Sequence, residues 1–247
     1  MRIALFGYGK MGIEIEKIAI ERGHSIVAIV NQKNSKEKIT KGDVDAVIEF
    51  SKPELAESHI AYCLNIGIPI VIGTTGWYNK LDSLTQLCTS KKGNMLHATN
   101  FSLGVNIFFE LSSQLAKIMN NYPNYSASIN EIHHTQKLDA PSGTGISLAE
   151  QLIANHSGYK DWANVKKSEI KSDTTLSIES FRLPDVPGTH EVIYESDIDK
   201  IEIKHIAHNR KGFALGSVIA AEWLLKNKEE QNLNASGVYT MKDVLKF

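Results

Sequence analysis

The sequence has little cysteine and no long hydrophobic run. Its 247 residues include two cysteines, Cys63 and Cys88, which are too few for a disulfide framework and lack the spacing of a metal site. We therefore expect both thiols to be reduced, as in a cytoplasmic protein. No run approaches the ~18 apolar residues of a membrane-spanning helix, and the N-terminal apolar run is too short for a signal peptide. These absences predict a cytoplasmic protein with no membrane partner.

Neither sign of charge is in excess. Lysine and arginine number 27 and acidic residues 28, which gives a net charge of -1. A protein that binds nucleic acid through its phosphates needs a positive surplus, so nucleic acid is not an expected partner, although a local basic pocket is still allowed. The hydrophobic share of 42% is that of a globular protein, which excludes a disordered chain.

Strands alternate with helices over the first hundred residues. Apolar runs predict strands at 2–6, 25–30, 45–50, 68–73 and 95–98, and helical periodicity predicts helices at 11–22, 53–65 and 79–91. This alternation is typical of a parallel α/β sheet. The polar stretch from 31 to 42 is short for a helical crossover, which indicates a trimmed sheet at that point.

The pattern changes after Asn100. The sequence predicts a helix at about 104–120, strands near 125–132, 175–183, 189–196 and 199–206, a helix at 142–154 and a last helix at 214–226. Successive strands without intervening helices predict an antiparallel or mixed sheet. We therefore expect an α+β domain of residues 103–211 inserted into an α/β domain formed by residues 1–102 and 212–247.

A glycine motif lies between the first strand and the first helix. Gly7, Gly9 and Gly12 form G-x-G-x-x-G, in which the first glycine permits a tight turn, the second lets the backbone approach a pyrophosphate and the third lets the helix pack against the strand. The helix N-terminus then offers N–H groups to the pyrophosphate. The motif predicts a Rossmann-type dinucleotide-binding domain; the alternative is a plain strand–turn–helix corner.

The end of the second strand carries no acidic residue. A carboxylate there binds the ribose hydroxyls of NADH, whereas this sequence has Asn31 and, two residues on, Lys33. Asn31 does not repel a 2′-phosphate, and Lys33 could attract one. The alternative is a solvated basic loop, so the cofactor is predicted as NADPH, NADH or both.

Ionisable residues are dense between 131 and 144. His133 and His134 can exchange protons near neutral pH, and Lys137 adds a cation. Pro141 suits the first turn of a helix, whose N-terminus next to these groups would receive a small carboxylate. The spacing favours proton transfer over metal ligation, so no metal is expected. The alternative is that the histidines are ordinary loop residues and the turn merely caps a helix.

The same segment carries a resemblance to a known family. Residues 131–144, EIHHTQKLDAPSGT, resemble the substrate-domain signature of the 4-hydroxy-tetrahydrodipicolinate reductase family, also called dihydrodipicolinate reductase. Further segments agree in order, so the resemblance spans nearly the whole chain: residues 73–76, 98–106, 188–192 and 210–216. The shortened region after the second strand and Asn31 depart from the family pattern.

The resemblance implies an activity and a set of site residues. It implies NAD(P)H-dependent reduction of a cyclic dicarboxylate with loss of water, in lysine and diaminopimelate synthesis, by a homotetramer whose inserted domain binds substrate and forms the oligomer. His133 and Lys137 would be catalytic, and His134, Gly143 and Thr144 would bind the substrate carboxylates. The implied cofactor-binding residues are Gly7, Tyr8, Gly9, Lys10, Met11, Gly12, Asn31, Lys33, Gly73, Thr74, Thr75, Thr99, Asn100 and Phe101.

Two other functions compete with this one. Another two-domain dehydrogenase would pair the same kinds of domain, but would not be expected to carry the combination of histidines, lysine and helix start. A dinucleotide-sensing protein without activity would keep the glycine motif and would need no proton donor such as His133.

Overall fold

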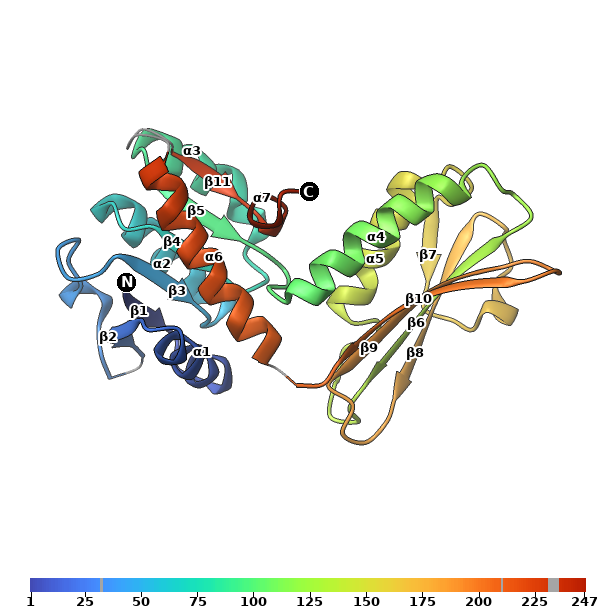
Figure 1. Ribbon diagram of the computed structural model, residues 1–247, viewed down its shortest axis with the longest axis horizontal. Coiled ribbons are helices and arrows are strands. Elements are labelled where there is room, and N and C mark those ends of the chain that lie inside the picture. The colour runs from blue at the N-terminus through green and yellow to red at the C-terminus, as the bar shows by residue number, and fades with distance from the viewer. Residues whose placement is uncertain (32, 210, 231–235) are drawn as a thin grey trace. The chain divides into compact units, whose positions relative to one another are not determined.

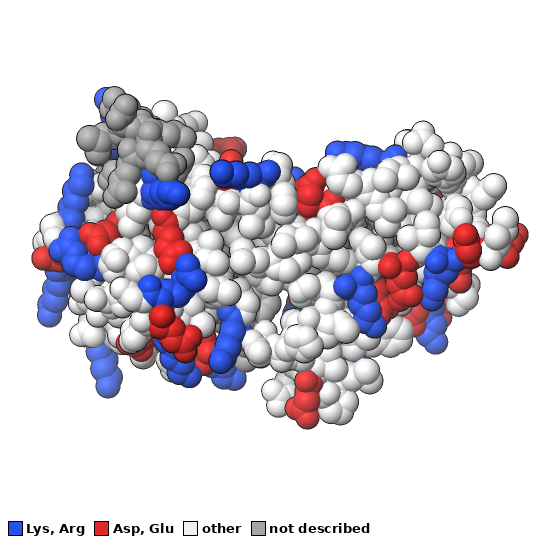
Figure 2. Space-filling view, viewed as in Figure 1, with Lys and Arg blue, Asp and Glu red and all other residues white. Residues whose placement is uncertain are grey.

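The chain forms two compact units, which are described separately. The computed structural model describes residues 1–31, 33–209, 211–230 and 236–247. One unit comprises Met1–Leu103 with Arg210–Phe247, and the other comprises Gly104–Asn209 (Figure 1). None of the described helices is long and apolar enough to cross a membrane. On the face drawn in Figure 2, basic and acidic side chains are interspersed, in keeping with the balanced charge.

The first unit is built on a parallel sheet. Its strands are β1 (Arg2–Phe6), β2 (Ser25–Val30), β3 (Ala46–Glu49), β4 (Ile70–Ile72), β5 (Asn94–His97) and β11 (Gly237–Tyr239). Their order is β11-β5-β4-β3-β1-β2, and all neighbouring strands are parallel. The chain therefore changes direction across the sheet between β1 and β3, and ligands of open α/β sheets bind at the carboxyl ends of the strands at such a point.

Helices cover both faces of this sheet. They are α1 (Lys10–Glu21), α2 (Pro53–Ile66), α3 (Leu81–Ser90), α6 (Lys211–Glu230) and α7 (Met241–Leu245). Alternate residues of β1 point to opposite faces: Phe6 packs in the core beneath α2 and α3, whereas Leu5 packs in the core beneath α1 and α6. The described residues between β2 and β3 form the short 3-10 helix η1 (Lys36–Lys38), so the sheet is trimmed at β2 as the sequence predicts.

The second unit is a mixed sheet with two helices. Its strands are β6 (Ser126–His133), β7 (Asp161–Ala163), β8 (Thr175–Arg182), β9 (Gly188–Glu195) and β10 (Lys200–Ala207), and its helices are α4 (Leu103–Met119) and α5 (Gly143–Asn155). The order is β10-β9-β6-β8-β7. β9 is antiparallel to β6 and β10, while β6, β8 and β7 run parallel. Figure 1 shows α4 and α5 along one face of the sheet, where they bury the core.

One prediction about α5 is wrong. Pro141 was expected in the first turn of this helix, but the helix begins at Gly143 and Ser142 is its N-cap. The physical reason is that the hydroxyl of Ser142 accepts the N–H of Gly145 at 3.0 Å, as N-cap side chains do. Pro141 therefore precedes the cap.

Candidate active site

The three glycines of the loop between β1 and α1 differ in whether a side chain would fit at their positions. Gly7 has a φ of 94°, and a Cβ there would lie 2.1 Å from the carbonyl oxygen of Phe50. A Cβ on Gly12 would lie 2.6 Å from the carbonyl oxygen of Gly7. A Cβ on Gly9 would meet no described atom within 4 Å. The fold itself therefore requires Gly7 and Gly12, whereas Gly9 faces open space.

The N-terminus of α1 is suited to an anion. Gly9 is its N-cap, no side-chain cap is made within the described part of the chain, and its first turn has no acidic residue. The exposed Lys10 adds a positive charge there. The N–H groups and the helix dipole are thus not neutralised by the protein, which is the condition for binding a phosphate.

A cavity of about 870 Å³ opens next to this helix start, a volume typical of a small-molecule site. Its lining comes from the carboxyl ends of β1, β2 and β3 and from α2: Gly7, Tyr8, Gly9, Val30, Asn31, Lys33, Asn34, Ser35, Lys36, Glu37, Phe50, Ser51, Lys52, Leu55 and His59. Five predicted residues meet here, namely Gly7, Tyr8, Gly9, Asn31 and Lys33. The sequence analysis missed Phe50 and Ser51, although they are the last residue of a predicted strand and the residue directly after it.

The loop after β2 is held by Asn31. Its side-chain oxygen accepts the N–H groups of Lys33 at 2.8 Å and Asn34 at 3.2 Å, an Asx turn. Lys33 is exposed on the cavity wall. The Nζ of Lys36 donates to the hydroxyl of Ser58 at 3.0 Å. Asn31 therefore shapes the loop, and its carboxamide oxygen is already engaged there.

The other predicted cofactor residues lie at the same edge of the sheet but outside the cavity lining. Gly73, Thr74 and Thr75 follow β4, and Thr99, Asn100 and Phe101 follow β5, while Lys10, Met11 and Gly12 form the first turn of α1. The hydroxyl of Thr74 accepts the N–H of Ser51 at 2.8 Å. Phe101 is buried, with its ring centroid 5.8 Å from that of Phe50. The side chains of Thr74 and Phe101 therefore serve the fold.

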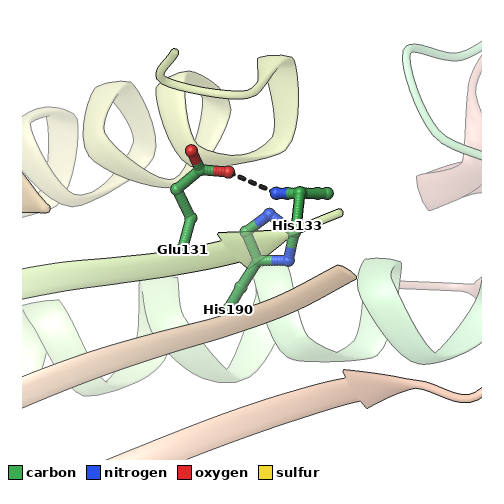
Figure 3. A group of neighbouring side chains, drawn as sticks. All are labelled: Glu131, His133 and His190. Carbon is green, nitrogen blue, oxygen red and sulfur yellow. Dashed lines mark ion pairs between the residues drawn. The ribbon is translucent and has the colours of Figure 1, made fainter. Parts of the chain in front are cut away.

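In the second unit, a buried acid contacts His133 at the end of β6. Glu131 is fully buried and His133 is 8% exposed. Being two residues apart on a strand, they share one face of the sheet, and His133 Nδ1 lies 2.5 Å from Glu131 Oε2 (Figure 3). On β8, the neighbouring strand in the sheet, Arg182 donates from Nη1 to the other carboxylate oxygen of Glu131 at 2.9 Å. Both oxygens of Glu131 therefore face a basic side chain.

The electrostatics of this group follow from burial and pairing. Burial acts to raise the pKa of Glu131, but the close pairing with His133 and the hydrogen bond from Arg182 more than offset it and hold that pKa well below its usual range. Burial, reinforced by the charge of His133, lowers the pKa of His190 to about 3. At neutral pH Glu131 is therefore an anion and His190 an uncharged imidazole.

His190 connects the group to α5. Its ring lies 5.1 Å from that of His133, and its Nε2 lies 3.1 Å from the hydroxyl of Ser142, the N-cap of α5. The sequence analysis missed His190, Glu131 and Arg182 as site residues. In the β6–β9 pairing His190 stands opposite Glu131, a relation that depends on strand register.

The side-chain donor atoms of Glu131, His133 and His190 lie within 4.8 Å of one another, close enough to consider a metal ion. The donor set fits such an ion poorly, because one carboxylate oxygen of Glu131 already binds Arg182 and the other faces His133. A cation placed among them would be repelled by the guanidinium. The arrangement is better suited to holding and moving a proton.

The remaining predicted residues lie in the turn between β6 and α5. The Nζ of Lys137 contacts both carboxylate oxygens of Asp139 at 2.8 Å, and this hydrogen bond lowers the pKa of Asp139. Gly143 is exposed at the start of α5, while His134 and Thr144 are half-buried. The first turn of α5 contains no acidic residue, so its dipole and Lys137 can together attract a carboxylate.

Comparison with family models covers both units. The model described as "Dihydrodipicolinate reductase, N-terminus" matches residues 1–101, and the C-terminus model of that name matches residues 104–245. The chain belongs to the dihydrodipicolinate reductase family. This confirms the predicted family and its reductase class, and it decides against the other two-domain dehydrogenases.

Individual relatives agree with the family. The chain is 44% identical to a 4-hydroxy-tetrahydrodipicolinate reductase of Christiangramia forsetii, over 99% of this chain and 98% of the relative. It is 34% identical to an enzyme of that name from Thermosipho africanus, over 100% and 98%. A dipicolinate-bound dihydrodipicolinate reductase from Paenisporosarcina sp. TG-14 aligns with a TM-score of 0.73 at 22% identity, over 97% of each chain. This last likeness confirms the predicted fold class.

The glycine loop leads to a first prediction. Gly9→Ala should weaken NADPH binding at least tenfold (about 1.4 kcal/mol), because the added methyl group enters the space open to the pyrophosphate, and it should leave the thermal unfolding midpoint unchanged. Fluorescence titration and thermal denaturation measure the two effects. The matched control is Gly42→Ala, whose Cβ would come no nearer than 3.9 Å to Thr40. Unchanged NADPH affinity in Gly9→Ala would show that the pyrophosphate binds elsewhere.

Proposed function

We propose that this chain reduces 4-hydroxy-tetrahydrodipicolinate to tetrahydrodipicolinate, with loss of water, using NADPH or NADH. The observation that carries the proposal is the pairing of His133 with the buried Glu131, in a chain matched over both units by models of this family. The named relatives support the substrate and its place in lysine and diaminopimelate synthesis. The unit of residues 1–102 and 212–247 would bind the cofactor, and residues 103–211 would bind the substrate.

The cofactor fits the first unit. Gly9 leaves room for a pyrophosphate, the uncapped start of α1 attracts its charge, and the adjoining cavity has room for the adenosine end beside Asn31 and Lys33. When bound, the dihydronicotinamide supplies the hydride. The residues after β4 and β5, Gly73 to Thr75 and Thr99 to Phe101, would contact it mainly through their backbone.

The residues of the second unit would manage charge and protons. Lys137 and the N-terminus of α5 would bind a substrate carboxylate, with Gly143, Thr144 and His134 beside it. As hydride arrives, negative charge develops toward the ring nitrogen and the carboxylate, and Lys137 with the helix dipole would stabilise that charge. His133 would deliver the balancing proton. The reaction consumes one hydride and one proton and releases the 4-hydroxyl group as water.

The protein would act as a homotetramer in the cytoplasm. Homotetramer formation would use the face of the second sheet that α4 and α5 leave uncovered, where the partly exposed Phe181 and Ile206 alternate with residues that point toward the helices. Cys63 and Cys88 are both buried thiols without a disulfide, which supports a reducing compartment such as the cytoplasm.

The activity is tested with the purified protein. It should oxidise NADPH or NADH only when the product of aspartate semialdehyde and pyruvate condensation is supplied. His133→Gln should lower turnover by about 10²–10⁴, the usual effect of losing a general acid, with cofactor affinity unchanged. If the folded wild-type protein oxidised neither NADPH nor NADH with this substrate, the proposed function would be wrong. Near-normal turnover of His133→Gln would remove that residue from the mechanism.

The carboxylate site is tested with pyridine-2,6-dicarboxylate, a planar unreactive mimic of the substrate. Lys137→Ala and Thr144→Ala should each weaken its inhibition, because they remove a charge and a hydroxyl from the proposed receptor. Lys117→Ala, which removes an exposed lysine from α4, is the matched control and should leave inhibition unchanged. Equal inhibition of all the variants and the wild type would place the substrate elsewhere.

Cofactor choice is tested at Lys33. NADPH should serve at least as well as NADH, and Lys33→Ala should raise the NADPH KM about fivefold, since an exposed contact contributes about 1 kcal/mol, while the NADH KM stays nearly constant. Lys38→Ala removes an exposed lysine of the same loop that does not line the cavity, and it should change neither KM. A strong wild-type preference for NADH would contradict the proposed contact.

A further inference from the structure

We propose that Glu131 is a positioning residue for proton transfer: its carboxylate accepts the Nδ1 proton of His133, so that Nε2 is the nitrogen that exchanges a proton with the substrate. The inference rests on the proposed catalytic role of His133. It concerns a residue that does not itself touch the reacting atoms but acts through another side chain.

The carboxylate has a single available orientation. Arg182 donates to Oε1 at 2.9 Å and His133 lies 2.5 Å from Oε2, so a rotation of the carboxylate group would break both contacts. Arg182 is itself fixed, because its Nη2 donates to the carbonyl oxygen of Asp139 at 2.6 Å. The Glu131 carboxylate is therefore held in place beside Nδ1, and a fixed carboxylate next to one ring nitrogen favours the tautomer that carries its proton on that nitrogen.

The opposite side of the ring is kept clear by a glycine. A Cβ on Gly188 would lie 3.1 Å from His133 Nε2 and 3.4 Å from Cδ2. Any side chain at that position of β9 would press against the nitrogen that we assign to proton exchange. The two nitrogens of His133 therefore have different surroundings. Nδ1 faces the buried carboxylate of Glu131, and Nε2 faces Gly188, which has no side chain.

The neighbouring charges agree with this assignment. Glu131 on the same strand lies beside Nδ1 of His133, the ring of His190 on β9 lies 5.1 Å from the His133 ring, and Arg182 on β8 stands opposite His133 in the strand pairing. His190 is uncharged because burial lowers its pKa to about 3, and Arg182 and Lys137 are each engaged with a carboxylate. Glu131 is therefore the carboxylate placed to balance a positive charge on the His133 ring.

The tautomer of His133 can be measured in the protein alone, without substrate or catalysis. In ¹⁵N-detected spectra of the histidine side chains, with His133 assigned by its absence in His133→Gln, the neutral ring should carry its proton on Nδ1. A proton on Nε2 would overturn the inference. Because this measurement uses the protein alone, it distinguishes failure of the inference from failure of the proposed reductase activity.

The kinetic test compares Glu131→Gln with Glu131→Asp. The Gln variant keeps a similar size without the charge, so we expect turnover to fall about 10- to 100-fold and the basic limb of the pH profile to move about one unit or more toward acid, the effect of removing an adjacent opposite charge. The Asp variant keeps the negative charge, but its shorter side chain places the carboxylate farther from His133, so we expect its pH profile to lie between those of the wild type and Glu131→Gln. An unshifted limb in folded Glu131→Gln would overturn the inference.

A double variant separates positioning from a structural role. If Glu131 acts through His133, the variant carrying both Glu131→Gln and His133→Gln should turn over no more slowly than His133→Gln alone. A further loss would show that Glu131 supports the site independently of His133. Unchanged binding of pyridine-2,6-dicarboxylate by Glu131→Gln serves as the check that the substrate site is still formed.

Discussion

A buried carboxylate facing two basic side chains is the interaction on which the second unit's site depends. Glu131 joins β6 to β8 through Arg182, and Arg182 also holds the turn before α5 through the carbonyl oxygen of Asp139. Removing one partner of such a pair leaves an uncompensated buried charge, which typically costs about 3–5 kcal/mol. Because pairing depresses the pKa of Glu131, its contribution to stability is present above the ordinary carboxyl pKa and is lost as the pH falls toward the depressed value.

Much of the fold could be predicted because its signals are local. Strands β1, β3 and β4 of the first sheet are buried on both faces, so they appear as apolar runs, and Pro53 marks the first turn of α2 as the sequence indicates. β7 and β11 were missed because each has only three residues and, unlike the equally short β4, neither is a fully buried apolar run. Pro141 was expected inside the first turn of α5, but it precedes the N-cap Ser142, because the serine hydroxyl and not the proline caps the helix.

The candidate site residues that the sequence indicated are those that are neighbours in the chain. The histidines, Lys137 and the helix start lie within one short segment, and the glycine motif is contiguous. Arg182 and His190 reach Glu131 from other strands: His133 stands opposite Arg182 in one pairing, and Glu131 stands opposite His190 in the other. Strand register is set by the packing of whole sheets, so no local pattern in one sequence reveals these partners.

At the trimmed edge of the first sheet, the loop after β2 lines the cavity without contributing to the hydrophobic core until Ile39. Residues 33 to 37 line the cavity and the short 3-10 helix ends at Lys38, whereas Ile39 is the first described residue after β2 to enter the core. Substitutions in this stretch change the charge that a ribose would meet without removing buried apolar surface. If this loop meets the ribose, as proposed, a change of its charge would alter the choice of nucleotide with little loss of stability, whereas a full crossover helix packed on the sheet would tie the same positions to the core.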